Sequence, residues 1–227
     1  MKTRRPYVIC HMTPSIDGKI VATNWASLRT ISAEYERTAD TFDADAWIAG
    51  RMSMAAYAGT ARMPRRKVKH RIPRRDFIAD RDAQVYAIAI DPLGKLTWQS
   101  NAIDDAHVIT VLSERVSDDY LAFLQSRGIS YVFGGRAGID LSRVLVKLRT
   151  AFGIRKLLLE GGGRINGSFL SADLIDELSV LIAPVADGSI GTPTLFDAKV
   201  GKGLARGRRL ISVARLKGEL VWLRYKM

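Results

Sequence analysis

The chain has 227 residues, 47% of them hydrophobic, with a single cysteine and a net charge of +12. This composition allows one large domain or two small ones, excludes an internal disulfide and, with three scattered histidines, argues against a structural zinc site. The sequence contains no run of about 18 apolar residues, the length needed to span a membrane. The N-terminus leads into a predicted strand instead of a signal peptide. We therefore expect a cytoplasmic protein without bound metal.

Along the first half of the chain, apolar runs typical of strands alternate with patterns typical of helices. The expected elements are a strand at 7–12, a helix at 32–42, a strand at 46–49 and a short helix at 51–57. Ser32 is expected to cap its helix, with Glu34 and Glu36 in the first turn, where the helix dipole favours acids. Cys10 is expected to be a buried structural cysteine and not a catalytic thiol.

The second half continues this alternation and ends in a hairpin. The expected strands lie at 85–90, 107–112, 129–133, 155–160, 176–185, 208–215 and 220–226, and the expected helices at 118–126, 141–152 and 164–173. The last two strands flank a Lys-Gly-Glu turn and are typical of an antiparallel pair. We therefore predict one three-layer α/β/α domain over residues 1–227, with a mixed, mostly parallel sheet and the antiparallel C-terminal hairpin at an edge.

The positive charge is concentrated in two segments, 62–75 with eight Lys and Arg, and 199–217 with seven. The remainder of the chain has 20 basic and 23 acidic residues. Neither segment has interleaved aromatic residues that could stack on bases, so nucleic acid is disfavoured as a partner. A solvated loop and a rim that attracts a phosphorylated ligand are both open interpretations.

Three predicted strands lead into loops that contain glycine. These loops are Ser15-Ile16-Asp17-Gly18-Lys19, Gly50-Arg51-Met52-Ser53 and Glu160-Gly161-Gly162-Gly163. None is a dinucleotide-binding fingerprint or a P-loop. Because ligands of open α/β sheets bind outside the carboxyl ends of parallel strands, we expect the three loops to outline one crevice.

The third loop carries the clearest chemistry, because an apolar strand ends at Glu160 and a helix begins after three glycines. Glycines let a ligand approach the backbone, and the free N–H groups of a helix start favour phosphate. Hydride transfer also needs a proton source, and Glu160 is the best candidate. Glu160 could instead cap the helix, Asp17 could serve only its Asp-Gly turn, and Lys19 could be solvated.

The segments 5–19 and 46–53, and most specifically LLLEGGGRINGSFLSADLIDELSVLIAPVADG at 157–188, resemble the reductase domain of the bifunctional riboflavin-biosynthesis deaminase/reductase family. That domain shares its fold with dihydrofolate reductase, so the resemblance implies a dihydrofolate-reductase-like fold for nearly the whole chain. The zinc-binding deaminase half has no counterpart here. The chain therefore resembles a stand-alone reductase.

The resemblance implies NADPH as the cofactor, with its phosphates held by the backbone of residues 162–168 and a further contact from Ser53. Arg51 and Arg164 are expected to select the 2′-phosphate. The residues expected to bind the cofactor are Gly50, Arg51, Ser53, Gly161, Gly162, Gly163, Arg164, Ile165, Asn166, Gly167 and Ser168.

For the substrate, the resemblance implies Glu160 as a substrate-side acid, which we expect to be catalytic, Lys19 as a substrate contact and Trp25 as the tryptophan beside the nicotinamide. We also expect Asp17 and Tyr57 to bind the substrate. The expected reaction is NADPH-dependent hydride transfer to a small heterocyclic, carbonyl or imine substrate, similar to 5-amino-6-(5-phosphoribosylamino)uracil reductase or dihydrofolate reductase. Tyr57 stands about where family members carry a substrate-binding Asp, which leaves the acceptor open. The resemblance also implies a homodimer.

A second hypothesis comes from the two basic segments. It is a binding module for nucleic acid or another polyanion on a catalytically silent reductase fold, which would bind with steep salt dependence. The phosphate-binding pattern after Glu160 favours the reductase.

Overall fold

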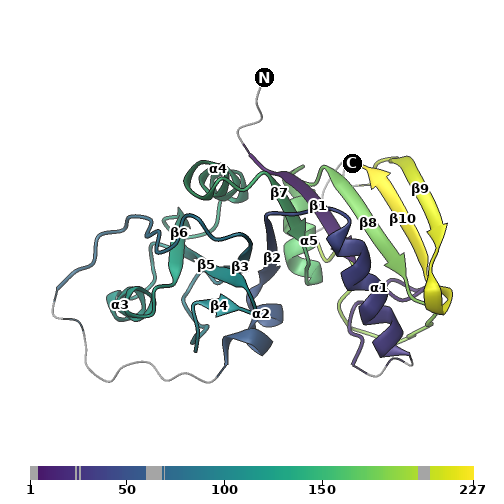
Figure 1. Ribbon diagram of the computed structural model, residues 1–227, viewed down its shortest axis with the longest axis horizontal. Helices are drawn as coiled ribbons and strands as arrows, with labels where there is room; N and C mark the ends of the chain where they lie inside the picture. The colour runs from purple at the N-terminus through teal and green to yellow at the C-terminus, as the bar shows by residue number, and fades with distance from the viewer. Residues whose placement is uncertain (1–4, 24, 26, 60–67, 69, 199–204) are drawn as a thin grey trace. The chain divides into compact units, whose positions relative to one another are not determined.

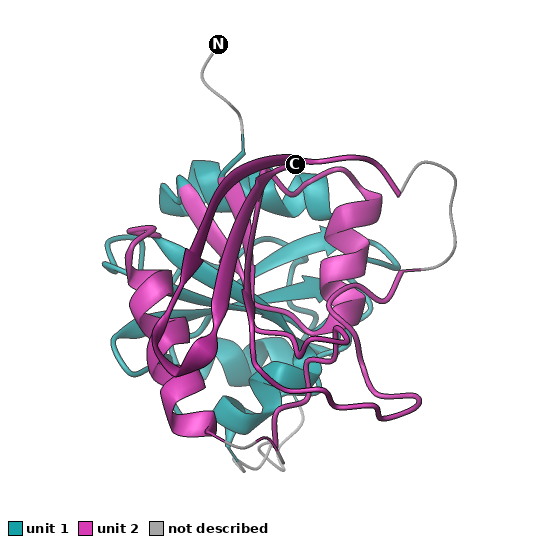
Figure 2. Ribbon diagram, turned by 90° about the vertical axis from the view of Figure 1, so that its right-hand side faces the viewer, with its two compact units in different colours: residues 1–6, 45–155 teal, residues 7–44, 156–227 magenta. Residues whose placement is uncertain are grey.

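A computed structural model describes residues 5–227 except 24, 26, 60–67, 69 and 199–204. The chain divides into two compact units (Figure 2). Unit 1 contains residues 1–6 and 45–155, and unit 2 contains residues 7–44 and 156–227. The single domain expected over residues 1–227 stays a prediction.

Unit 1 is built on a mostly parallel sheet with helices between its strands (Figure 1). Its strands are β2 (Ala46–Gly50), β3 (Tyr86–Ile90), β4 (Ala102–Ile103), β5 (Ala106–Ser113) and β6 (Ser130–Gly135), and its helices are α2 (Arg51–Ala58), α3 (Asp118–Ser126) and α4 (Leu141–Phe152). β2, β3, β5 and β6 pair in parallel in that order, and the short β4 runs antiparallel to β5. Every residue of β3 and β5 is buried, as continuous apolar strands of parallel sheets are.

Unit 2 combines parallel strands with the predicted C-terminal hairpin. Its strands are β1 (Tyr7–Met12), β7 (Lys156–Leu159), β8 (Glu177–Ile182), β9 (Arg209–Arg215) and β10 (Val221–Lys226), and its helices are α1 (Leu28–Asp40), α5 (Gly163–Ser171) and the short 3₁₀ turn η1 (Lys217–Glu219). β7, β1 and β8 pair in parallel, while β10 pairs antiparallel to both β8 and β9. The predicted α/β class, with its antiparallel hairpin at an edge, is confirmed.

The start of α1 was predicted wrongly. The helix begins at Leu28 after Ser27, so Ser32 lies inside it and is not its cap, and Glu34, expected in the first turn, is buried further along the helix. The N-terminal turn instead places Ile31 in a small core cluster with Trp25 and Leu181. Tertiary burial of this turn outweighs the local capping signal.

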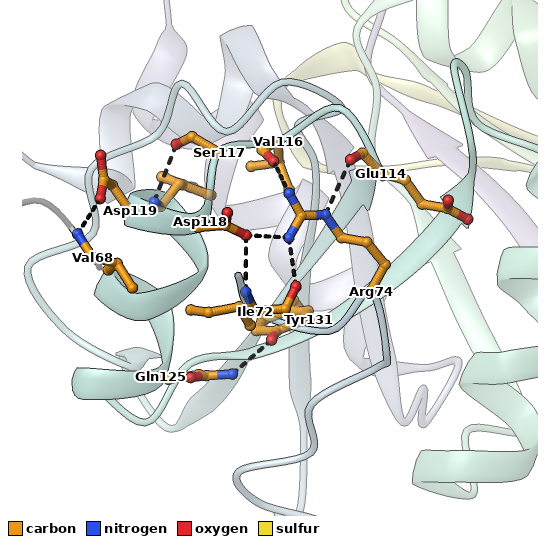
Figure 3. A network of polar contacts seen from close by, with 11 residues as sticks. Val68, Ile72, Arg74, Glu114, Val116, Ser117, Asp118, Asp119, Gln125 and Tyr131 are labelled. Atoms are coloured by element: carbon orange, nitrogen blue, oxygen red, sulfur yellow. Dashed lines mark hydrogen bonds and ion pairs between the residues drawn. The ribbon is translucent and has the colours of Figure 1, made fainter. Parts of the chain in front are cut away.

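The described part of the first basic segment is docked on α3 (Figure 3). The Arg74 guanidinium donates to the carbonyls of Ile72 (2.7 Å) and Val116 (2.8 Å) and forms an ion pair with Asp118. Asp118 also accepts from the backbone N–H of Ile72 (3.1 Å), whose side chain is buried. Ile72 and Arg74 are thus held against the protein, while His70, Arg71, Pro73 and Arg75 are exposed, and both interpretations of this segment stay open. Residues 60–67 and 69 lie outside the described residues.

Candidate active site

Glu160 lies at the carboxyl end of β7, in unit 2. The parallel register pairs Cys10 of β1 with Leu159 of β7, so both strands leave the sheet beside Glu160. Burial raises the pKa of Glu160 to about 7; a hydrogen bond with the Tyr35 hydroxyl lowers it, and the nearby charge of Glu36 raises it further. A carboxyl with this pKa can both hold and release a proton near neutral pH.

The glycine loop after Glu160 turns directly into α5. Gly161 has a φ of +94°, which glycine adopts without strain, and Gly162 is the N-cap residue without any side-chain cap. Gly162 therefore offers no side-chain hydrogen bond to the first-turn N–H groups, although the Asp197 carboxylate lies beside Gly163, where a Cβ would be 2.4 Å from its Oδ2. An uncapped helix start of this kind suits an anion such as a phosphate.

Two of the glycines in this segment serve the fold of unit 2 itself. A Cβ on Gly163 would lie 2.3 Å from the carbonyl oxygen of Thr194, and one on Gly167 would lie 2.6 Å from that of Asp197. The Asp197 N–H donates to the carbonyl of Gly163 (2.9 Å). These glycines let the segment around Asp197 approach α5, whatever else the helix binds.

The rest of α5 divides into an inner and an outer side. Asn166 is fully buried: its Nδ2 donates to the carbonyl of Leu195 (3.0 Å), and its Oδ1 has no hydrogen-bond partner among the described residues. Arg164 and Ser168 are exposed, and Ile165 is half-buried. Arg164 is therefore the side chain of this segment best placed to meet an anion at the helix start.

Asp17 has a structural role in the loop after β1. Its carboxylate accepts from the Ser15 hydroxyl (2.7 Å) and from the N–H groups of Asp187 (2.9 Å) and Gly188 (2.9 Å), which hold its pKa well below the ordinary value. Lys19 forms an antiparallel bridge with Thr194. The Asp17 carboxylate thus stabilises the turn in which it lies. The substrate-binding roles of Asp17 and Lys19 stay predictions.

Trp25 is a core residue of unit 2. It is 8% exposed, packs in the cluster with Ile31 and Leu181, and donates through its indole N–H to Asp187 (2.9 Å). Its expected contact with the substrate stays a prediction.

The remaining predicted residues lie in unit 1, at the junction of β2 and α2. Gly50 is the N-cap of α2, and Arg51, Ser53 and Tyr57 are exposed on that helix. The Tyr57 ring packs edge-on against Trp47, with 5.7 Å between centroids. The structure thus gathers Gly50, Arg51, Ser53 and Tyr57 in one unit and Glu160, the α5 segment, Asp17, Lys19 and Trp25 in the other.

Two residues near these loops were not predicted from the sequence. Asp91 follows β3, is fully buried and accepts from the N–H groups of Lys95 (2.5 Å) and Leu96 (2.7 Å), while the charge of Arg51 acts on it. Tyr35 of α1 contacts Glu160. The sequence did not single out Tyr35, because a tyrosine in an amphipathic helix is most often a packing residue.

A mostly parallel α/β sheet with an antiparallel hairpin, and a carboxyl with a raised pKa before a helix start, are consistent with one class of enzyme, the oxidoreductases with a dihydrofolate-reductase-like fold. The chain matches the RibD C-terminal domain over residues 6–214 and belongs to that family. This confirms the resemblance found in the sequence.

The curated relatives are reductases. The chain is 30% identical over 197 residues to the 2,5-diamino-6-ribosylamino-4(3H)-pyrimidinone 5′-phosphate reductase of Methanothermobacter thermautotrophicus, covering 86% of this chain and 85% of the relative. It is 26% identical over 216 residues to the protein of the same name from Archaeoglobus fulgidus, covering 93% and 94%. The chain is thus a reductase, and the family implies a nicotinamide cofactor.

Solved structures agree with this fold. The RibD of Acinetobacter baumannii superposes with a TM-score of 0.69 at 19% identity, covering all of this chain and 59% of the RibD chain. A pyrimidine reductase-like protein from Corynebacterium diphtheriae gives a TM-score of 0.70 at 15% identity, covering 97% of this chain and 91% of that protein.

Within the described residues, no helix has the length and apolarity needed to cross a membrane. A catalytically silent polyanion-binding module is not favoured.

Proposed function

We propose that this protein is an NADPH-dependent reductase of riboflavin biosynthesis, acting in the cytoplasm on a ribosylaminopyrimidine phosphate like those in the names of its relatives. The identity to those reductases over most of both chains supports the substrate class. The observation that carries the proposal is Glu160, a carboxyl with a pKa of about 7 that directly precedes the uncapped start of α5.

In this proposal the cofactor phosphates bind at the first turn of α5, through the N–H groups of Gly163 and Arg164 and the Arg164 guanidinium. Arg51 and Ser53 at the start of α2 provide further contacts, and the two arginines favour a 2′-phosphate. When bound, the reduced nicotinamide supplies the hydride. The uncapped helix start and the exposed Arg164 fit such a group.

Glu160 gives the proton that must accompany the hydride. Reduction of a carbon–nitrogen or carbon–oxygen double bond places a hydride on carbon and a proton on the heteroatom, and a carboxyl protonated below pH 7 can donate that proton. Lys19 and Asp17, in the loop after β1, and Tyr57 of α2 are the further substrate-binding residues of this proposal.

The test combines binding and turnover. Saturation with NADPH at about 100 times its Kd should stabilise the protein by about 2.7 kcal/mol, and NADH should do so only at higher concentration. The pyrimidinone phosphate that appears in the names of the relatives should be reduced, and NADPH should be oxidised in the same reaction. Arg51→Ala and Arg164→Ala should each reduce the preference for NADPH over NADH. Absence of binding by either nucleotide would refute the proposal.

We also propose a homodimer that forms through β9. This strand lies at the edge of the unit 2 sheet, and all seven of its residues are exposed. Leu210, Ile211 and Val213 are 49%, 43% and 60% exposed. An edge strand with exposed apolar side chains is suited to pairing with the same strand of a second copy.

A further inference from the structure

The hydroxyl of Tyr35 lies where β1 and β7 end. It donates to the carbonyl oxygen of His11 (3.2 Å) and lies close enough to the Glu160 carboxyl to lower the pKa of that group. Since Cys10 pairs with Leu159 in the parallel register, the next residues along the two strands, His11 and Glu160, follow side by side. One hydroxyl from α1 therefore reaches both strand ends.

His11 fixes the position of this tyrosine. The two rings are stacked, with 4.5 Å between centroids and 26° between planes. His11 Nε2 lies 3.2 Å from the Tyr35 carbonyl, which can only accept, so Nε2 carries the hydrogen and Nδ1 accepts from the Ser179 hydroxyl (2.9 Å). Trp222 in turn donates to Ser179 (2.8 Å). Burial lowers the pKa of His11 to about 4, so the ring is neutral in this network.

A tyrosine hydroxyl has one hydrogen and free lone pairs, so it can pair with a carboxyl in either protonation state. When Glu160 is ionised, the hydroxyl hydrogen can turn to the carboxylate. When Glu160 is protonated, the carboxyl can donate to the Tyr35 oxygen while the Tyr35 hydrogen stays on the His11 carbonyl. Tyr35 therefore has a hydrogen-bond geometry for Glu160 before and after a proton leaves it.

We propose that Tyr35 is a positioning residue for the reduction: held by His11, its hydroxyl orients the Glu160 carboxyl toward the substrate and pairs with it in both protonation states. This inference rests on the proposed function. Tyr35 acts through Glu160 and needs no contact with substrate or cofactor.

Of the groups that act on Glu160, the Tyr35 hydroxyl is the one that favours the ionised carboxylate. Glu36 of α1, itself close to Asp40, repels the carboxylate, and Cys10 of β1 is a buried thiol whose pKa is raised by burial. None of the ion pairs between described residues includes Glu160. The Tyr35 hydroxyl is thus the group that lowers the pKa of Glu160, and its loss should raise that pKa.

The test is Tyr35→Phe, which keeps the ring on His11 and removes only the hydroxyl. We expect kcat to fall about tenfold with the KM for NADPH within about twofold, and the alkaline limb of the pH profile to move to higher pH. In the Glu160→Gln background, Tyr35→Phe should cause no further loss of kcat. Tyr86→Phe is the matched control, because that hydroxyl also donates to a backbone carbonyl, of Arg81 (2.6 Å) in unit 1.

A titration of the Glu160 carboxyl by difference infrared spectroscopy, assigned with Glu160→Gln, needs no turnover. A Glu160 pKa raised by Tyr35→Phe supports the inference even if the protein reduces a different substrate. An unchanged titration, or losses of kcat that simply multiply in the double variant, would overturn it even if the protein is the proposed reductase. Should Tyr35→Phe fail to fold, Glu160→Asp, which withdraws the carboxyl from the hydroxyl, takes its place in the same titration.

Discussion

Glu160 destabilises the folded protein when it is ionised, because burial raises its pKa from 4.5 to about 7. A carboxyl with a raised folded-state pKa contributes its full stability below the unfolded pKa, and that stability is lost as pH rises toward 7. This unfavourable burial keeps a proton available near neutral pH. Functional groups often lower stability in this way.

Glu160→Gln should therefore lower kcat by about 10²-fold or more while it stabilises the protein at pH 8 by on the order of 1–3 kcal/mol. At pH 4, where Glu160 is protonated, the gain should vanish. Urea unfolding at the two pH values measures this difference. Glu219→Gln, at an exposed ion pair with Arg215, is the control with little effect at either pH. Equal stability changes at pH 4 and pH 8 would contradict the raised pKa.

At the scale of elements, α5 depends on the close approach of another backbone segment to its glycines. Gly167→Ala would place a Cβ 2.6 Å from the Asp197 carbonyl, which belongs to backbone and cannot simply move aside. We expect a loss of about 1–3 kcal/mol in the free energy of unfolding. Gly207→Ala, where a Cβ meets nothing within 4 Å, should change it by less than about 0.5 kcal/mol. Chemical denaturation compares them, and equal stabilities would disprove the packing role.

Local sequence signals located some elements well and others poorly. α3 and α4 begin where predicted, because the Ser117 and Asp140 side chains accept from the N–H groups of Tyr120 (3.2 Å) and Arg143 (3.0 Å). α1 begins four residues early, since its first turn is stabilised by burial in unit 2. β4 has two residues and was not predicted, because so short a strand has no periodicity.

At the scale of the whole molecule, the exposed β9 edge predicts self-association. Val213→Lys should weaken dimerisation at least about tenfold, because a lysine on an edge strand opposes strand pairing. Light scattering over a range of concentrations measures this. Ile190→Lys, at a residue that is 99% exposed and outside any strand, is the control. A monomeric wild-type protein, or an unchanged dimer in Val213→Lys, would exclude this interface.

The sequence by itself determined the fold class, the family and the position of Glu160 before a glycine helix start, because these depend on apolar periodicity and on motifs of adjacent residues. Only the tertiary structure showed that Gly163 and Gly167 pack against the Asp197 segment and that Tyr35 pairs with Glu160. Such contacts join residues far apart in the chain. Burial and distance, which set the pKa of Glu160, exist only after those residues have come together.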